Sequence, residues 1–181
     1  KKKKKVLSEI DMYYGDVKMP KGFEINRKLI KGEIIYNSVM SNEIKNTEHE
    51  DYKIKDTTIL YPLHTYLTDF MNLKFKKSIY YIDSWGTVVY PGQQTMIRDT
   101  LNPISLGLSA DYTIVYGVDI HGKENNLVIK YDQNRRAGRS WVIPMDNNKF
   151  VMFPSTCKYY ITKNLSNTLN TYLGFTFNYT E

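Results

Sequence analysis

The stretch KFVMFPSTCKYYITKN, residues 149–164, contains the pattern that decides the fold of the second half of the chain. An apolar run, Phe150–Phe153, leads into a Pro-Ser pair, and an aromatic run, Tyr159–Thr162, follows it closely. Short runs rich in Val, Tyr, Phe and Thr that are bounded by Pro and Asn are typical of β-strands. We therefore predict two strands separated by a short turn, with Tyr159 opening the second strand.

Strands of the same kind continue on both sides of this stretch. Runs of Ile, Val, Tyr, Phe and Thr, separated by Gly, Asn, Asp and Pro, extend over the last hundred or so residues. The predicted strands are Ser78–Tyr90, Asp111–Ile120, Asn126–Tyr131, Ser140–Ile143, Phe150–Phe153, Tyr159–Thr162 and Tyr172–Tyr179. Many short strands with turn signals between them predict an antiparallel sandwich or barrel.

The first part of the chain has a helical character. Apolar side chains follow a helical stripe over Glu24–Met40, although Gly32 weakens it, and a cleaner stripe covers Ile59–Met71. We therefore predict an extended basic N-terminal arm at 1–22, a helical support region at 23–76 with a polar loop at 41–58, and a β domain at 77–181. The expected fold class is mainly β, with two supporting helices and an extended arm before it.

Composition limits the environment of the protein. Hydrophobic residues make up 41% of the 181 residues, which predicts a globular domain with a buried core. No apolar run approaches the ~20 residues that cross a bilayer, and no leader-like segment opens the chain, so we expect neither membrane insertion nor secretion. The single cysteine, Cys157, excludes an internal disulfide and fits a reducing interior.

The net charge of +6 is concentrated at the start of the chain. Five of the 25 Lys and Arg residues are Lys1, Lys2, Lys3, Lys4 and Lys5, and the others nearly balance the 19 acidic residues. A domain that binds nucleic acid with one face should stay basic without such a tail. We expect a solvated lysine-rich arm, for which an acidic protein surface or nucleic acid is a candidate partner.

The β region resembles a known enzyme family. The order of the strands and the segments Trp85–Gly92, Ile143-Pro144, Phe153–Ser155 and Phe175–Asn178 are similar to the iron- and 2-oxoglutarate-dependent oxygenases. The likeness is greatest to the prolyl-4-hydroxylase-like forms of tailed bacteriophages, and it covers about Ile79–Asn178. It implies a double-stranded β-helix, which is a jelly roll preceded by helices that support one sheet.

The resemblance also implies where the chemistry would lie. The family holds ferrous iron with two histidines and a carboxylate, and an arginine anchors the cosubstrate. The family's His-x-Asp pair falls on Arg98 and Thr100, its third ligand falls on Tyr159, and its arginine falls on Tyr172. Asp99 is one residue out of register, which in a strand means the opposite face. Because every expected position is substituted, we expect no metal and no cofactor.

In this register Tyr159 and Tyr172 should point into the barrel and fill the space that iron and cosubstrate need. Each hydroxyl should have a hydrogen-bond partner, because an unpaired buried hydroxyl costs about 1–3 kcal/mol. Arg98 is the candidate donor, and Asp111 is the candidate carboxylate that neutralises it. The expected result is a closed barrel without a pocket for a dicarboxylate.

An atypical metal site is the alternative. His49–Asp51 has the His-x-Asp form, and His121 lies at a suitable distance along the chain, but both fall in predicted loops or turns. Asp119 and His121 are otherwise expected to be turn residues in water. His64 falls off the apolar stripe of its helix, where we expect it to be exposed. Tyrosine can ligate iron, so Tyr159 remains a formal candidate ligand.

The sequence favours an interaction role over catalysis. Sixteen tyrosines suit interfaces, because tyrosine combines a large contact area with a polar tip. We expect the N-terminal segment with Tyr13 and Tyr14 to lie on a neighbouring subunit, and a basic loop with Arg135, Arg136 and Arg139 to offer a second contact.

The usage of Lys, Asn, Ile and Tyr suggests an AT-rich genome, as in many large tailed phages. Our hypothesis is a noncatalytic structural or interaction component of a tailed-phage virion (neck, tail or head), with protein subunits as partners and the virion or host cytoplasm as its location. An active Fe(II)/2-oxoglutarate-dependent hydroxylase with an atypical metal site is the alternative. Fold by itself does not decide between them.

Overall fold

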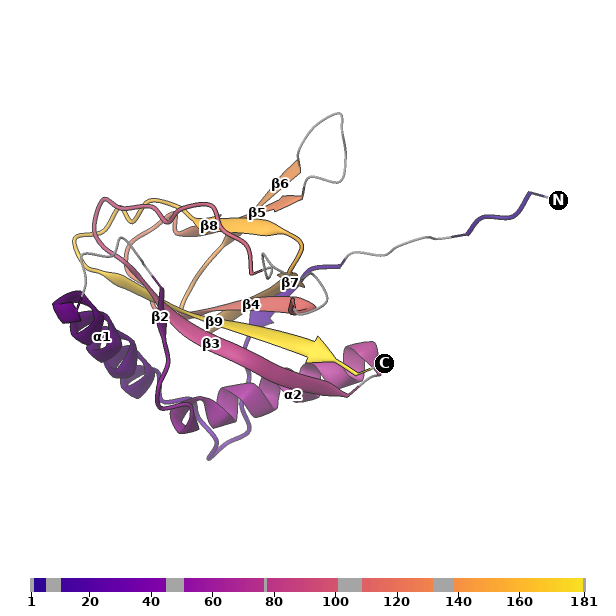
Figure 1. Ribbon diagram of the computed structural model, residues 1–181, viewed down its shortest axis with the longest axis horizontal. Helices are drawn as coiled ribbons and strands as arrows, with labels where there is room; N and C mark the ends of the chain where they lie inside the picture. The colour runs from indigo at the N-terminus through magenta and orange to yellow at the C-terminus, as the bar shows by residue number, and fades with distance from the viewer. Residues whose placement is uncertain are drawn as a thin grey trace.

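The computed structural model describes residues 2–5, 11–44, 51–76, 78–100, 109–131 and 139–180 of the chain. Two helices, a six-stranded sheet and a three-stranded sheet form three stacked layers (Figure 1). The elements are β1 (Tyr13–Asp16), α1 (Arg27–Ile44), β2 (Asp51–Lys53), a 3-10 turn (Thr58–Leu60), α2 (Tyr61–Phe75), β3 (Ile79–Val89), β4 (Tyr112–Asp119), β5 (Asn126–Tyr131), β6 (Arg139–Pro144), β7 (Lys149–Pro154), β8 (Lys158–Ile161) and β9 (Asn170–Tyr179). The strand order is β1-β7-β4-β9-β3-β2 in the large sheet and β6-β5-β8 in the small sheet.

The two helices cover the outer face of the large sheet. In α2 the buried residues Leu63, Leu67 and Met71 are spaced by four, so they form one stripe that packs on the sheet. The first helix, α1, packs closely on Gly86 of β3, where an added Cβ would lie 2.5 Å from the side chain of Ile34. Neither helix in the described part of the chain has the length and apolar character that a membrane crossing needs.

A second core lies between the two sheets. Strand β9 is central in the large sheet and is covered on both sides, which explains why its residues are buried almost without interruption. Leu173, Phe175 and Phe177 turn toward the helices, whereas Tyr172 turns toward the small sheet. The inter-sheet core also contains Tyr159, so the inward orientation expected for both tyrosines is what the structure has.

Most of the predicted elements are confirmed, with ends that differ by a few residues. The prediction of a mainly β protein with two helices is confirmed as well. Two strands were not predicted. Strand β1 pairs with β7 of its own chain from Tyr13↔Met152 onward, so it continues the large sheet. Val17, which follows β1, is buried. Strand β2, in the predicted loop, pairs with β3.

Residues of the predicted arm (1–22) and of the predicted helical support region (23–76) therefore belong to the same sheet as the β domain. The expectation that Tyr13 and Tyr14 lie on a neighbouring subunit is wrong for the backbone of this segment, which is an edge strand of its own sheet. The physical reason is that β7 otherwise would expose a row of unpaired N–H and C=O groups, and β1 satisfies them.

Candidate functional site

Two of the positions that the sequence resemblance matched to metal ligands, Arg98 and Tyr159, lie next to each other. The segment before residue 100 runs next to β8: the Arg98 N–H donates to the Tyr159 carbonyl at 2.9 Å, and the Tyr159 N–H donates back at 2.8 Å. Two residues along, the Ile161 N–H donates to Thr95 Oγ1 at 2.7 Å. The chain segment from Thr95 to Arg98 thus extends the small sheet beyond β8 and fixes Arg98 beside Tyr159.

An ion pair occupies this place. Arg98 Nη1 donates to Asp51 Oδ2, and the Arg98 guanidinium lies 5.7 Å from the centre of the Tyr159 ring. The other oxygen of Asp51 accepts from Thr87 Oγ1 at 2.5 Å. The Arg98 side chain is only 16% exposed, so this charge depends on a nearby carboxylate. The expected partner, Asp111, is wrong: Asp111 instead accepts from the Tyr179 N–H at the end of β9.

Tyr159 is a neutral, buried phenol in the inter-sheet core. The ring is 3% exposed and packs edge-to-face on Phe153, with 5.3 Å between ring centres. Burial raises the pKa of Tyr159, although the nearby Arg98 guanidinium and the Trp85 indole, which can only donate, act in the opposite direction. The phenolate form that would bind a metal is therefore disfavoured here.

Trp85 reaches Tyr159 by lying across β9. An added Cβ on Gly174, its neighbour on that strand, would lie 2.2 Å from the indole Cε2, so only glycine leaves room for the ring. The sequence reasoning did not find this contact, because it depends on which residues of β3 and β9 face each other.

Tyr172 departs from the expectation that each inward hydroxyl is hydrogen-bonded. Its side chain is 1% exposed, and within the described part of the chain its hydroxyl has no hydrogen-bond partner. Burial raises the pKa of Tyr172, so this phenol is also neutral. The position that the sequence resemblance matched to the cosubstrate-anchoring arginine therefore carries an uncharged group.

Thr100 belongs to a chain of hydroxyls. Thr100 Oγ1 lies 2.7 Å from Thr113 Oγ1, which lies 2.9 Å from Ser155 Oγ. Thr113 and Ser155 are fully buried, so these hydrogen bonds satisfy groups that water does not reach. Ser155 is the serine of the Phe-Pro-Ser turn, and its role here is structural.

These residues do not fit ferrous iron. The matched positions offer a guanidinium, an alcohol and a neutral phenol in place of two imidazoles and a carboxylate. In the described part of the chain no three His, Cys, Asp or Glu side chains lie close enough to hold a metal ion. Of the alternative ligands, His49 lies outside the described residues, and His121 Nε2 lies 2.9 Å from Asp119 Oδ2.

His64 is not exposed as expected. Its ring packs against Tyr81 and Phe175, with ring centres 4.4 Å and 4.7 Å away, and its Nε2 is buried without a partner among the described residues. Burial lowers the pKa of His64 from 6.5 to about 4. His64 therefore belongs to the core between α2 and the sheet, on the opposite side of the sheet from Arg98 and Tyr159.

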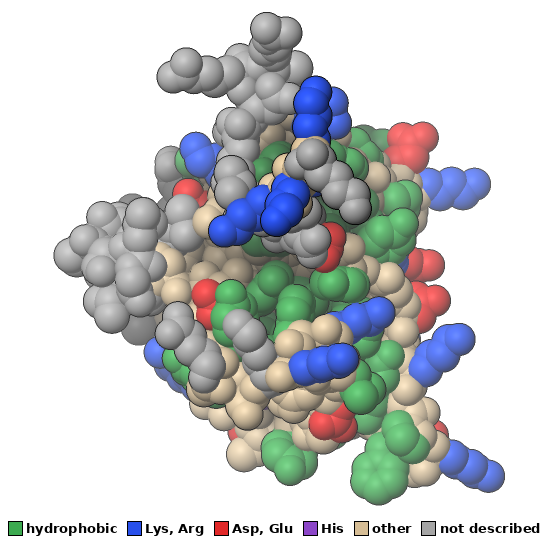
Figure 2. Space-filling view, turned by 90° about the vertical axis from the view of Figure 1, so that its right-hand side faces the viewer, with side chains coloured by type: hydrophobic (Ala, Val, Ile, Leu, Met, Phe, Trp, Pro, Cys, Tyr) green, Lys and Arg blue, Asp and Glu red, His purple; other side chains and the backbone are tan. Residues whose placement is uncertain are grey.

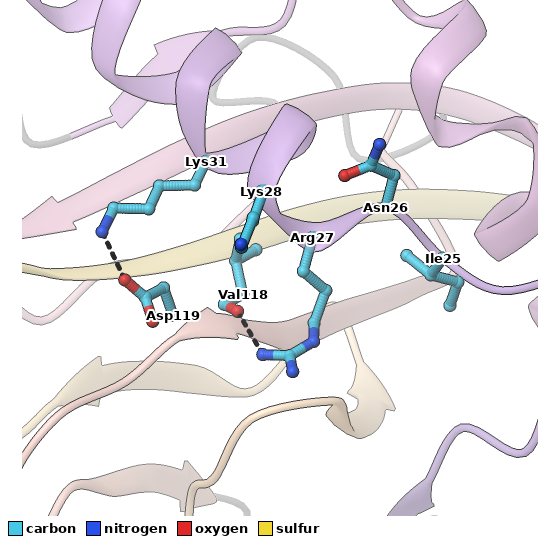
Figure 3. A pocket seen from close by; sticks show the side chains of 7 residues that line it. All are labelled: Ile25, Asn26, Arg27, Lys28, Lys31, Val118 and Asp119. Carbon is cyan, nitrogen blue, oxygen red and sulfur yellow. Dashed lines mark hydrogen bonds and ion pairs between the residues drawn. The ribbon is translucent and has the colours of Figure 1, made fainter.

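A hollow lies where α1 begins (Figure 3). This cavity of about 430 Å³ is lined by Ile25, Asn26, Arg27, Lys28, Lys31, Val118 and Asp119. Arg27 Nη1 donates to the Val118 carbonyl at 2.9 Å, and Lys31 pairs with Asp119. Burial acts to raise the pKa of Asp119, but hydrogen bonds from Lys31 and His121 outweigh it and the pKa lies below its ordinary value. Both basic side chains thus have partners within the protein.

The residues predicted to contact partners are not brought together at one place. Lys2–Lys5 are exposed, Arg139 opens β6 and is exposed, and Lys1, Arg135 and Arg136 lie outside the described residues. Tyr13 packs on Phe70 and Phe75, whereas Tyr14 is 58% exposed. From the right-hand side of Figure 1, hydrophobic side chains gather in the middle of the face and Lys and Arg project around them (Figure 2).

Comparison with known proteins identifies the fold. No protein-family model and no curated protein sequence matches the chain. Among solved structures, AviO1 from Streptomyces viridochromogenes Tue57 matches with a TM-score of 0.66 and 9% identity over 93% of this chain and 90% of that one. A viral collagen prolyl hydroxylase from Paramecium Bursaria Chlorella virus-1, in complex with 2OG, matches with a TM-score of 0.59 and 11% identity over 91% and 95% of the two chains.

A 2OG-Fe(II) oxygenase family oxidoreductase from Burkholderia pseudomallei matches with a TM-score of 0.54 and 13% identity over 67% of this chain. The match spans only 56% of the Burkholderia protein. These likenesses establish the fold: the protein is a double-stranded β-helix like that of the 2OG-Fe(II) oxygenases, as the resemblance in sequence implied.

Proposed function

We propose that the protein is a noncatalytic member of this fold that works as a structural or interaction component. The observation that carries the proposal is the Arg98–Asp51 ion pair packed on the Tyr159 ring. In the register that the sequence resemblance implies, this ion pair takes the place of the family's metal, and a cation there would be repelled by the Arg98 guanidinium. Iron binding would require this arginine to leave or to lose its partner.

The position of the cosubstrate anchor supports the same proposal. A dicarboxylate held in a protein interior needs a cation, and arginine provides two parallel hydrogen bonds to a carboxylate. The neutral, buried Tyr172 offers at most one hydrogen bond and no charge. A closed interior without a dicarboxylate pocket is part of this proposal.

The alternative function is an active Fe(II)/2-oxoglutarate oxygenase with an atypical metal site. The fold favours it, since the solved structures of similar fold named above include a 2OG-Fe(II) oxygenase family protein and a prolyl hydroxylase. The donor set favours the noncatalytic proposal, because none of the matched positions carries an ordinary ligand of ferrous iron.

The proposed partners are protein subunits of a larger assembly, and a tailed-phage virion (neck, tail or head) is the proposed setting. Abundant tyrosine and the AT-rich residue usage support this part, together with the phage-like sequence resemblance. The lysine-rich start of the chain, with Lys2–Lys5 exposed, is proposed to contact an acidic surface or nucleic acid.

The experiment measures Fe(II) binding by the purified protein under anaerobic conditions, and then 2-oxoglutarate turnover after oxygen is admitted, because release of succinate consumes O2. A prolyl hydroxylase of the same fold, treated identically, serves as the positive control. We expect no bound iron at micromolar concentration and no succinate above background. Stoichiometric iron or released succinate would establish the oxygenase alternative instead.

A further inference from the structure

Among the strands that the structure describes, β6 is an edge of the small sheet. In the strand order β6-β5-β8, β6 has β5 on one side and no other described strand on the opposite side. Five of its six residues are exposed, and only Ile143 is buried. A six-residue strand with an open side is a template on which another chain can add a strand.

The hydrogen-bond register identifies the backbone groups that face this open side. The Thr162 N–H donates to the Asn126 carbonyl at 2.9 Å, so Asn126 turns its backbone groups toward β8. Antiparallel ladders alternate, so Val128 and Lys130 also face β8, whereas the residues between them face β6. Through the pairs Val128↔Val142 and Lys130↔Ser140, the N–H and C=O groups of Val142 and Ser140 point away from β5.

The middle of the β6 edge, from Ser140 to Ile143, lacks the features that protect other edges of this protein. Edge strand β2 has only three residues and two of them, Asp51 and Lys53, are charged; β1 has four residues and ends in Asp16. In contrast, β6 has two large exposed apolar residues, Trp141 at 39% and Val142 at 58%. Short or charged edges resist strand addition, and long apolar ones favour it.

The charge of the small sheet indicates what kind of strand fits. The three strands, NLVIKY, RSWVIP and KYYI, contain Lys130, Arg139 and Lys158 and no acidic residue. Lys130 and Lys158 are direct cross-strand partners on the outer face, a like-charge pair that is unfavourable by itself. Ser140 of β6 pairs with Lys130 from the other side, so Lys158, Lys130 and Ser140 form one row across the outer face of the small sheet. An anionic side chain next to Ser140 would relieve the repulsion.

We propose that the β6 edge binds an extended, acidic segment of a partner protein by strand addition. This deepens the proposed interaction function and rests on it. The partner segment pairs with Ser140 and Val142, and its side chains alternate: apolar ones lie beside Trp141 on the inner face, and acidic ones lie beside the Ser140–Lys130–Lys158 row on the outer face. A second copy of β6 fits less well, because that strand has no acidic residue.

The test uses a short end-blocked peptide of alternating valine and glutamate as the probe, with alternating valine and lysine as its control. Binding is followed by titration and by NMR hydrogen exchange of the Ser140 and Val142 amides. We expect the acidic peptide to bind and to protect these amides, and the lysine peptide not to. Equal binding of the two peptides, or binding without protection of these amides, would overturn the proposal.

Two variants of one residue separate the backbone contribution from the side chain. Val142→Pro removes an N–H that points to the open side and leaves the β5 ladder intact, whereas Val142→Thr keeps the N–H. We expect the proline variant to weaken binding about tenfold and the threonine variant to change it little. Equal affinities of the two variants would contradict strand addition.

A double variant, Lys130→Glu with Lys158→Glu, leaves the backbone unchanged, so it tests the charge even if the proline variant folds poorly. It should lose the preference for the acidic peptide, and a retained preference would contradict the assigned row of charges. A protein that dimerises with both amides protected in the absence of peptide would assign the edge to a second copy and overturn the partner proposal. Iron binding is measured separately, so failure here is distinct from failure of the noncatalytic assignment.

Discussion

The buried His64 predicts a loss of stability in mild acid that one substitution should remove. The imidazole packs between Tyr81 and Phe175, and its buried Nε2 has no hydrogen-bond partner among the described residues. Burial therefore favours the neutral ring and lowers the pKa of His64 from 6.5 to about 4. Between these two values the unfolded chain binds a proton that the folded chain excludes, so acid shifts the equilibrium toward unfolding.

The magnitude follows from the two pKa values. The stability contribution is complete above about pH 6.5 and is lost as the pH falls toward 4. One pKa unit corresponds to about 1.4 kcal/mol, which gives an upper limit of roughly 3 kcal/mol for complete loss. Part of the ring is exposed to solvent, which screens the effect, so we expect about 1–2 kcal/mol by pH 5.

The assay is urea unfolding at about pH 7.5 and about pH 5, comparing the wild type with His64→Leu. Both proteins lose stability from other groups, so the measured quantity is the difference in their pH dependence. We expect the leucine variant to lose about 1–2 kcal/mol less than the wild type, and the control His121→Gln, which keeps His64, to behave as the wild type. Equal losses for His64→Leu and the wild type would refute the assignment of a buried neutral imidazole.

Three further predictions concern the inter-sheet core and the N-terminus. Tyr172→Phe should leave the thermal midpoint unchanged or raise it, since among the described residues the hydroxyl has no hydrogen-bond partner to lose. A clear fall in the thermal midpoint would show that the hydroxyl forms a stabilising hydrogen bond. Asp51→Asn should lower the free energy of unfolding in urea by about 1–3 kcal/mol, because it leaves Arg98 without its carboxylate. Adding Arg98→Leu should recover part of this loss, and no recovery would show that the two residues do not act as a pair. Deleting residues 1–5 should not change the melting temperature, whereas deleting residues 1–17 should lower it, since it removes β1 and the buried Val17; equal melting temperatures would place β1 outside the cooperative unit.

The fold could be predicted from the sequence because its signals are local. Short apolar strands with turn residues between them, and two helical stripes before them, need no knowledge of distant contacts. The alternation of side chains along β8 and β9 also made it possible to place Tyr159 and Tyr172 inside. These inferences rest on the spacing of apolar residues along the helices and on the alternation of side chains along the strands, and the structure has both.

The site could be predicted only in part, because its partners come from distant segments. Arg98 and Asp51 are 47 residues apart, and they meet because β2 pairs with β3. Nothing in the charged segment around Asp51 marked it as a strand. His64 was misplaced because α2 packs closely enough for a residue beside its main apolar stripe to reach Phe175. Likewise β1 was taken for a free arm, since four residues carry little strand signal.

We propose that this protein keeps the oxygenase fold while its metal ligands are replaced. Anaerobic Fe(II) titration of the wild type beside the triple variant Arg98→His, Thr100→Asp and Tyr159→His tests it most directly, because the variant restores the family's donors at the matched positions. We predict no binding by the wild type at micromolar iron and measurable binding by the folded variant. One equivalent of iron bound by the wild type would contradict the account.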